Sequence, residues 1–200
     1  MKISSEVEVC NLALLRINQV SISSLDENSL EARACKLNFQ QSKSYLLAQY
    51  PWTFATFRAI LIKVDDNSLW EYSNKYQLPP EFLRMLAIYD SGNNQLTSIT
   101  GAKSPYVLEG GYILSNYSGL KMKYIKDIDN IVSFSPEFID CLVLDLALRL
   151  TKYFNDSTSY LQLLMSEFER KFTLAKNSDC QQTLIGGMLN YPLLAESMEF

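Results

Sequence analysis

The side chains that could carry catalysis in this chain are carboxylates, thiols, lysines and tyrosines, because its 200 residues include no histidine. That absence excludes Ser-His-Asp and Cys-His catalysis and histidine-ligated metal sites. It also removes the side chain that most often acts as a base near neutral pH. An enzyme built from this sequence would therefore have to work with carboxylates, lysine, tyrosine or cysteine alone.

Paired carboxylates are one catalytic arrangement that needs no histidine. Glycoside hydrolysis uses two acids about 5 to 10 Å apart, one of which has a raised pKa. The middle third of the chain supplies four acids for this role, Glu71, Glu81, Asp90 and Glu109. They adjoin predicted turns and strand ends, where solvated acids are common. A polysaccharide or peptidoglycan hydrolase stays an alternative that requires Glu81 or Glu109 to share a cleft with a second acid.

The cysteines and glycines do not predict a site. Cys10, Cys35, Cys141 and Cys180 lie far apart without a C-x-x-C pair, which predicts reduced thiols, three in helical cores and Cys180 in a tail. The glycine pair of "LEGGY" is followed by a predicted strand, whereas a phosphate-binding loop opens a helix with a lysine and a hydroxyl residue. We predict a hairpin turn there, and no catalytic residue, metal or cofactor.

Composition predicts a single globular domain with or without an insert. The chain is 48% hydrophobic and 20% charged, with a net charge of −4. Lysine and arginine do not cluster along the sequence, which argues against a broad basic face for nucleic acid. The N-terminal stretch "MKISSEVEVC" has no apolar signal region, and no apolar run approaches the ~18 residues of a membrane span. We expect a soluble protein made in the cytoplasm, with no membrane partner.

Two helices are predicted before the middle third. Ser5 and Glu8 form a possible capping box for the first helix, which should stop near Asn18, and Leu12 and Leu15 widen its apolar stripe. The second helix is expected over residues 29–49. Asn28 is its predicted cap, Pro51 ends it, and its apolar side is expected to include Leu30, Ala34, Leu37, Phe39 and Leu46.

The period changes from 3.6 to 2 at Thr53, which predicts a small antiparallel sheet. A helical turn is expected at Pro80–Leu83, before a strand that ends at Asp90. The clearest hairpin joins Tyr106–Leu108 to Tyr112–Leu114. The alternating stretch "LKMKYIKDI" predicts a further strand.

Two more helices follow the sheet. Ser135 and Pro136 mark the start of the third helix, and the fourth is expected over residues 157–176 with Met165 facing inward. The order predicts an α+β fold, a four-helix bundle of two helical hairpins with a small antiparallel β-sheet inserted between helices 2 and 3. The predicted segments are a helical hairpin at 1–52, a β insert at 53–134, a second helical hairpin at 135–177 and a docking tail at 178–200.

Aromatic and apolar residues supply the candidate protein interface. The stretch "YPWTFATFRAIL" places Trp52 at the exit from the bundle, where we interpret it as a plug between layers. The tail has a polar spacer followed by large apolar residues, a pattern that favours docking onto a partner. The candidate interface residues are Trp52, Trp70, Tyr72, Tyr106, Tyr112, Leu184, Ile185, Met188, Leu189 and Tyr191.

Several stretches together resemble one known family. "CNLALLRIN", "SLDENSLEARAC", "YPWTFATFRAIL", "YQLPPEFLRML", "YVLEGGYIL" and "LKMKYIKDI" are similar, in this order, to the tail tubular protein A family of short-tailed, T7-like bacteriophages and prophages. The resemblance covers about residues 5–176, and its most specific parts are "PW-F" and "EGGYIL". Asn18 departs from the glycine that such sequences often carry, and residues beyond 178 match no motif of the family.

The resemblance implies a structural adaptor, also called a gatekeeper, rather than an enzyme. Members of this family form a ring, typically of twelve copies, beneath the portal protein and bind the tail nozzle protein below. The bore of the ring passes the genome without sequence-specific DNA binding. The expected location is therefore the virion, in the tail at the head-tail junction.

Overall fold

The computed structural model describes most of the chain, namely residues 3–64, 71–97, 103–154 and 158–188. The chain divides into two compact units, which we call the helical unit and the sheet unit. The helical unit comprises the residues up to Leu46, Trp52–Phe54 and the residues from Asp129 onward; the sheet unit comprises Leu47–Pro51 and Ala55–Ile128. The predicted α+β class is confirmed, since antiparallel sheets are inserted between the second and third of four packed helices in the described residues.

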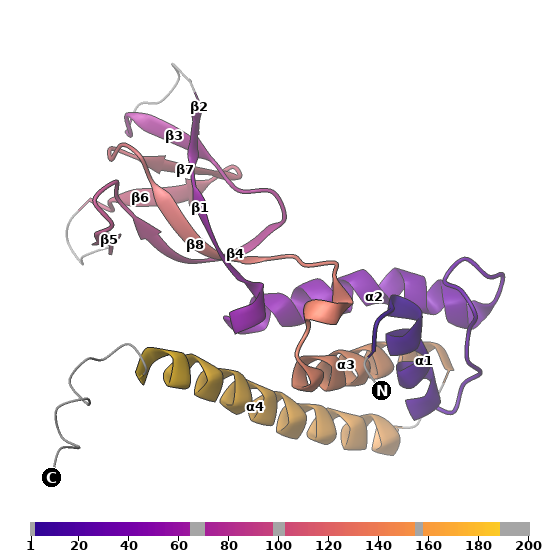
Figure 1. Ribbon diagram of the computed structural model, residues 1–200. Coiled ribbons are helices and arrows are strands. Elements are labelled where there is room, and N and C mark those ends of the chain that lie inside the picture. Colours follow the sequence, from indigo (N-terminus) through magenta and orange to yellow (C-terminus); the bar gives the residue numbers. More distant parts are fainter. Residues whose placement is uncertain (1–2, 65–70, 98–102, 155–157, 189–200) are drawn as a thin grey trace, which may run out of the picture. The chain divides into compact units, whose positions relative to one another are not determined.

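The helical unit is organised around its third helix. Its elements are α1 (Glu6–Arg16), α2 (Leu30–Gln49), the 3-10 turns η1 (Thr53–Ala55) and η2 (Ile131–Ser133), α3 (Pro136–Phe154) and α4 (Thr158–Met188) (Figure 1). Helix α3 packs against α1 and α4, and a hydrogen bond joins it to α2. Its apolar side chains at Phe138, Leu142 and Leu146 are fully buried, which makes α3 the core of this unit.

Capping residues set the starts of the helices largely as predicted. The Ser5–Glu8 capping box is present, and Asn18 adopts a left-handed conformation with φ of 55° after α1. The Ser135 hydroxyl accepts a hydrogen bond from the Phe138 N–H at the start of α3. The prediction that Asn28 caps α2 was wrong. The neighbouring Ser29 hydroxyl accepts from the Ala32 N–H at 3.1 Å and takes that role.

The predicted apolar side of α2 was partly wrong. Leu37 is 72% exposed and Leu30 is also exposed, whereas the predicted core residues Ala34, Phe39 and Leu46 are buried. The buried side of α2 includes polar residues, because α3 and the segment before it supply them with partners. The Ser42 hydroxyl donates to Asp145 at 2.5 Å, and the Lys43 ammonium contacts Asp129 at 2.5 Å. Polar groups with hydrogen-bond partners thus occupy part of the buried side of α2, where the pattern had predicted apolar side chains such as Leu37.

Helix α4 is longer than predicted. The polar stretch after Lys176 was expected to open a tail at residue 178, but α4 continues to Met188. Asp179 explains the continuation, because the residue is only 6% exposed and its carboxylate accepts hydrogen bonds from the Thr53 N–H and hydroxyl. A polar residue that looked like part of a spacer therefore docks the helix onto η1.

The sheet unit contains two four-stranded antiparallel sheets rather than the single sheet predicted. The strands are β1 (Thr56–Ile60), β2 (Ile62–Val64), β3 (Asn74–Gln77), β4 (Phe82–Tyr89), β5 (Gln95–Leu96), β6 (Tyr106–Glu109), β7 (Tyr112–Ser115) and β8 (Lys121–Lys126). One sheet has the order β1-β8-β4-β5 and the other β2-β3-β7-β6. Leu61 lies where the chain passes from the first sheet to the second, and its N–H donates to the Leu120 carbonyl.

The apolar core of the sheet unit includes residues of both sheets. Its buried members are Leu61, Tyr76, Ile88, Leu96, Ile113, Leu120, Met122 and Tyr124. Alternate residues of a strand point to opposite faces, so the neighbours of Met122 on β8 lie on the other face of that sheet. Lys121 and Lys123 of β8 therefore lie on the face of the sheet away from Met122.

Turn geometry confirms one prediction in this unit and corrects another. The predicted hairpin between β6 and β7 is present, and it turns at Gly110 and Gly111, whose φ angles are 55° and 81°. Glu109, which was expected in the turn, is the last residue of β6. The predicted helical turn at Pro80–Leu83 was wrong, because Glu81 has a φ of 56°. The Glu81 carbonyl instead accepts from the Asp127 N–H, and β4 begins at the next residue.

Candidate interaction surfaces

Trp52 lies in the core of the helical unit. Its side chain has no exposed surface, and its ring packs edge-on against Phe138 and Phe172 at 5.1 and 6.0 Å between centroids. The indole N–H donates to the Leu46 carbonyl at 2.9 Å, so the polar atom of the ring is satisfied. Burial, ring packing and a satisfied N–H together show that Trp52 packs the core of the helical unit.

The other aromatic candidates lie in the sheet unit. Tyr72 is buried, and the Lys103 ammonium lies 4.6 Å from the centroid of its ring. Tyr106 and Tyr112 are partly buried on β6 and β7, and Lys75 lies 4.2 Å from the centre of the Tyr112 ring. Cations of the protein itself thus partly cover Tyr72 and Tyr112, while Trp70 lies outside the described residues.

The apolar candidates near the C-terminus fall in two regions. Leu184, Ile185 and Met188 belong to the last turns of α4 rather than to an irregular tail, and the structure does not describe their side chains. Leu189 and Tyr191 lie outside the described residues.

Among the described contacts, none joins two of the four carboxylate candidates. Glu81 is ion-paired with Lys126 at 2.7 Å, and Glu71 and Glu109 are exposed. Asp90 accepts hydrogen bonds from the side chain and N–H of Asn94, which lower the pKa of its carboxyl. A general acid requires the opposite shift. The geometry therefore gives the hydrolase alternative no support.

The thiols follow the predicted pattern of burial. Cys10, Cys35 and Cys141 are buried and free, whereas Cys180 is exposed on α4. Burial raises the pKa of the Cys141 thiol to about 12, which keeps it protonated at neutral pH. A protonated, buried thiol is not a nucleophile, so Cys141 acts as a core residue.

The surface around α1 carries a hollow of about 440 Å³. We call it the α1 surface, and Ile3, Glu8, Asn11, Leu12, Leu15 and Ser21 line it. Leu15 is 67% exposed, although its spacing predicted a place in the apolar stripe of the helix. The Asn11 side chain holds the chain beyond α1 in place, since it bonds both the N–H and the carbonyl of Ile22 at 2.7 and 2.9 Å.

A second hollow, of about 450 Å³, opens between α2, α3 and α4. We call it the α3 groove, and Tyr45, Asp145, Leu148, Arg149, Lys152, Leu161 and Met165 line it. Met165 was predicted to face inward but is 49% exposed. Arg149 forms an ion pair with Asp145 at 2.7 Å and lies over the Tyr45 ring. This network fixes the polar wall of the groove.

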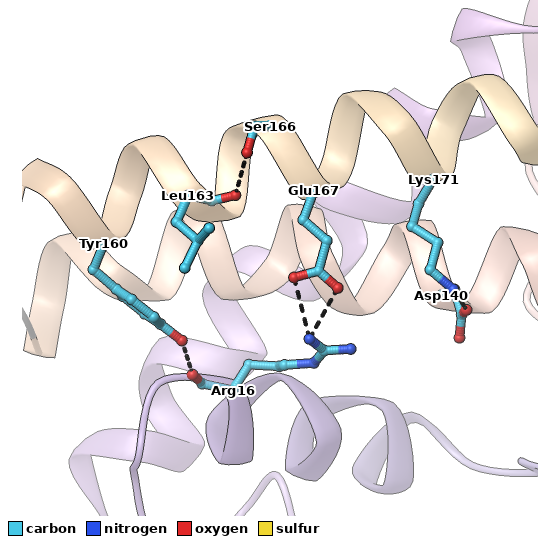
Figure 2. A network of polar contacts seen from close by, with 7 residues as sticks. All are labelled: Arg16, Asp140, Tyr160, Leu163, Ser166, Glu167 and Lys171. Atoms are coloured by element: carbon cyan, nitrogen blue, oxygen red, sulfur yellow. Dashed lines mark hydrogen bonds and ion pairs between the residues drawn. The ribbon is translucent and has the colours of Figure 1, made fainter.

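Polar contacts join α1, α3 and α4, three of the helices that carry the two hollows. Figure 2 shows Tyr160 of α4 donating to the Arg16 carbonyl at the end of α1, beside an ion pair of 3.0 Å between Arg16 and Glu167. A second ion pair, of 2.7 Å, joins Lys171 of α4 to Asp140 of α3. Exposed ion pairs stabilise a fold by less than about 1 kcal/mol each, so their main effect here is to fix the relative position of the helices.

The α1 surface and the α3 groove carry opposite charges. Glu8 belongs to the α1 surface, and hydrogen bonds from the Ser4 and Ser5 N–H groups lower the pKa of its carboxyl and keep it ionised. Arg149 and Lys152 belong to the α3 groove, where Asp145 is partnered by Arg149. The two hollows share no lining residue. They are therefore two different surfaces with complementary charge.

Neither comparison with known proteins nor a search for metal sites and membrane spans assigns a function to the surfaces. Comparison with models of protein families and with curated proteins found no match to this chain. Within the described residues, no cluster of three or more cysteines or acids could hold a metal ion. No helix in that part of the chain is both long and apolar enough to cross a membrane.

Proposed function

We propose that this protein is a structural phage tail protein, an adaptor that forms a ring and connects the portal to the tail nozzle. The proposal joins two lines of support. The sequence resembles the tail tubular protein A family over most of its length, and the chain has the order of helices and sheets expected of it. In this function no catalytic residue or cofactor is needed.

The observation that carries the proposal is the pair of unlike hollows on the helical unit. A closed ring of identical copies needs a heterologous interface, in which each copy presents two different, complementary surfaces. The α1 surface offers exposed Leu12 and Leu15 with an acidic edge, and the α3 groove offers apolar walls with a basic edge. In the proposed ring, the exposed Leu12 and Leu15 of the α1 surface of one copy pack into the α3 groove of the next.

The remaining partners follow from the resemblance. The proposed ring, of typically twelve copies, sits at the head-tail junction of the virion after synthesis in the host cytoplasm. The sheet unit and the chain beyond Ser178 are the proposed contacts to the portal and nozzle proteins. The bore passes DNA without reading its sequence.

The experiment that tests this proposal compares two substitutions of exposed leucines. L15D places a charge in the α1 surface, whereas L37D makes the same change on α2, outside both hollows. Mass is measured by light scattering, for each protein alone and with the portal protein of the same phage. We expect the wild type and L37D to assemble at least in the presence of the portal protein. We expect L15D to stay monomeric both alone and with the portal protein.

A charge reversal in the α3 groove provides a second test of the same interface. K152E should weaken assembly and make the remaining assembly less dependent on salt, because Lys152 lies where Glu8 of the neighbouring copy is proposed to dock. Assembly of L15D to the same extent as L37D would contradict the proposed interface. A wild-type protein that stays monomeric even with the portal would contradict the adaptor function itself.

A further inference from the structure

Strands β1 and β8 bring three cations to one face of their sheet. In the antiparallel register, Arg58 lies directly opposite Lys123, and Ile60 lies opposite Lys121. Alternate residues of a strand share a face, so Lys121 and Lys123 lie together while Met122 between them is buried in the core. The sequence shows no basic cluster because Arg58 and the two lysines are far apart along the chain.

The pairing of Arg58 with Lys123 is unfavourable by itself. Like charges directly opposite each other destabilise a pair of strands. In the described part of the chain, neither side chain forms a hydrogen bond or an ion pair. Lys121, by contrast, is held in position by the Ser91 carbonyl at 3.0 Å and the Asn93 amide oxygen at 2.7 Å. This face therefore presents two unneutralised cations beside a third that is fixed.

A nearby carboxylate compensates only part of this charge. Asp90 lies close enough to Lys121 to interact with it, but its two oxygens are engaged by Asn94. Setting its single negative charge against Arg58, Lys121 and Lys123 leaves two positive charges in excess. Such an excess stands out in a chain whose overall charge is −4.

The cations line a hollow of about 380 Å³. Its other lining residues are Ala59, Ile60, Tyr89, Asn93 and Met122. The hollow lies within the size range of small-molecule sites, and Tyr89 and Asn93 bring further polar groups to its wall. Ile60 is 75% exposed beside the cations. The concave shape gives an anion contacts from three strands, β1, β8 and β4, and from the turn after β4.

We propose that this hollow on β1 and β8 binds a phosphate group. The planar fork of Arg58 suits two oxygens of one phosphate, and the lysines add point charges around it. A phosphate monoester carries nearly two negative charges at neutral pH, and it therefore matches the excess of two positive charges. A ligand with one carboxylate would compensate only half of that excess. The phosphate site does not depend on the ring proposed above.

The same chemistry could come from a small phosphate compound or from the phosphodiester backbone of nucleic acid, in which two neighbouring phosphates with one charge each would match the excess. Calorimetric titrations with inorganic phosphate and with a short single-stranded DNA distinguish the two sources, using the full chain at neutral pH. Saturable binding of inorganic phosphate that the DNA does not displace identifies a small phosphate ligand. Tighter, salt-sensitive binding of the DNA that also depends on Arg58 identifies the backbone.

The matched variants are R58Q and K63Q. Both remove one exposed cation, from strands that follow each other in the chain, but Lys63 on β2 belongs to the other sheet and does not line the hollow. We expect R58Q to weaken binding at least about tenfold, the effect of losing a charge-assisted bond, and K63Q to leave it nearly unchanged. Without ligand, R58Q should melt at or above the wild-type temperature, since it removes the repulsion from Lys123.

Two results would overturn the proposal. One is the absence of saturable binding for both inorganic phosphate and the DNA. The other is an equal loss of affinity in R58Q and K63Q, because that result indicates general attraction by charge rather than a site. The melting temperature of unliganded R58Q shows that any loss of binding comes from the hollow and not from unfolding.

Discussion

Replacing Asp179 tests how the C-terminal half of α4 is held in place. The Asp179 carboxylate accepts from the Thr53 N–H at 3.1 Å and from the Thr53 hydroxyl at 3.0 Å, and its residue is 6% exposed. These bonds tie α4 to η1, next to the buried Trp52. We expect D179A to release this end of the helix while α1 and α2 keep their structure.

The size of the effect follows from the hydrogen bonds that the substitution removes. A hydrogen bond to a charged group stabilises a fold by roughly 1.5 to 3 kcal/mol. Thr53 is exposed, so water can replace the carboxylate at its donors, and alanine is a better helix former than aspartate by about 0.6 kcal/mol. Both effects make the loss of stability smaller, and we expect D179A to reduce the free energy of unfolding by about 2 kcal/mol. D179N, which keeps a neutral acceptor, should lose about half as much.

Urea denaturation and hydrogen exchange together measure this prediction. Asn177 is exposed on the same helix, so N177A is the matched control and should change stability by less than about 0.5 kcal/mol. In D179A, the amides from Cys180 to Met188 should exchange faster than in the wild type. Unchanged stability together with unchanged exchange in these amides would refute the role given to Asp179.

Three further predictions concern single residues. A thiol reagent at neutral pH should modify Cys180 long before Cys141, because Cys141 is buried and its pKa is raised to about 12; equal labelling in the folded protein would contradict this. The Glu27 carboxyl should titrate in NMR near its pKa of about 2, since the Ser23 hydroxyl and N–H bond its ionised form. A depressed pKa stabilises the fold above the ordinary value of 4.5, and this contribution disappears as the pH falls toward 2. A measured Glu27 pKa near 4.5 would show these bonds to be absent in solution. W52A should reduce the free energy of unfolding by about 4 kcal/mol, as large aromatic core deletions do, and normal stability combined with lost assembly would place Trp52 at an interface instead.

Local signals in the sequence predicted local structure well. The Ser5–Glu8 box, the left-handed Asn18 and the Ser135-Pro136 start each depend on neighbouring residues alone, and the structure has all three. The glycine pair at 110 and 111 likewise determined its own turn. Short-range hydrogen bonds and permitted φ angles are sufficient causes of these features.

Features that depend on distant partners were predicted poorly. Lys43 of α2 is buried against Asp129, which lies far away in the sequence, and nothing in the pattern of α2 predicted this. Asp179 looked like part of a spacer, yet Thr53 engages it. In both cases the partner was not recognisable from the local pattern, so the buried polar contact could not be predicted.

The apolar residues of the proposed interaction surfaces were misplaced for a related reason. Leu12, Leu15 and Met165 were assigned to core faces because they are apolar and fit a helical period, but the structure exposes them. The signal was present, since the apolar stripe of the first helix was wider than one packing face requires. The basic hollow could be recognised only once the register placed Arg58 opposite Lys123.

The measurement that tests the central proposal most directly is the native mass of the wild-type protein, alone and with the portal protein of the same phage. The adaptor function predicts a closed complex with many copies of this 22.9 kDa chain on each portal, whether or not a ring already forms without it. A chain that stays monomeric and does not bind the portal at any concentration tested would contradict the proposal.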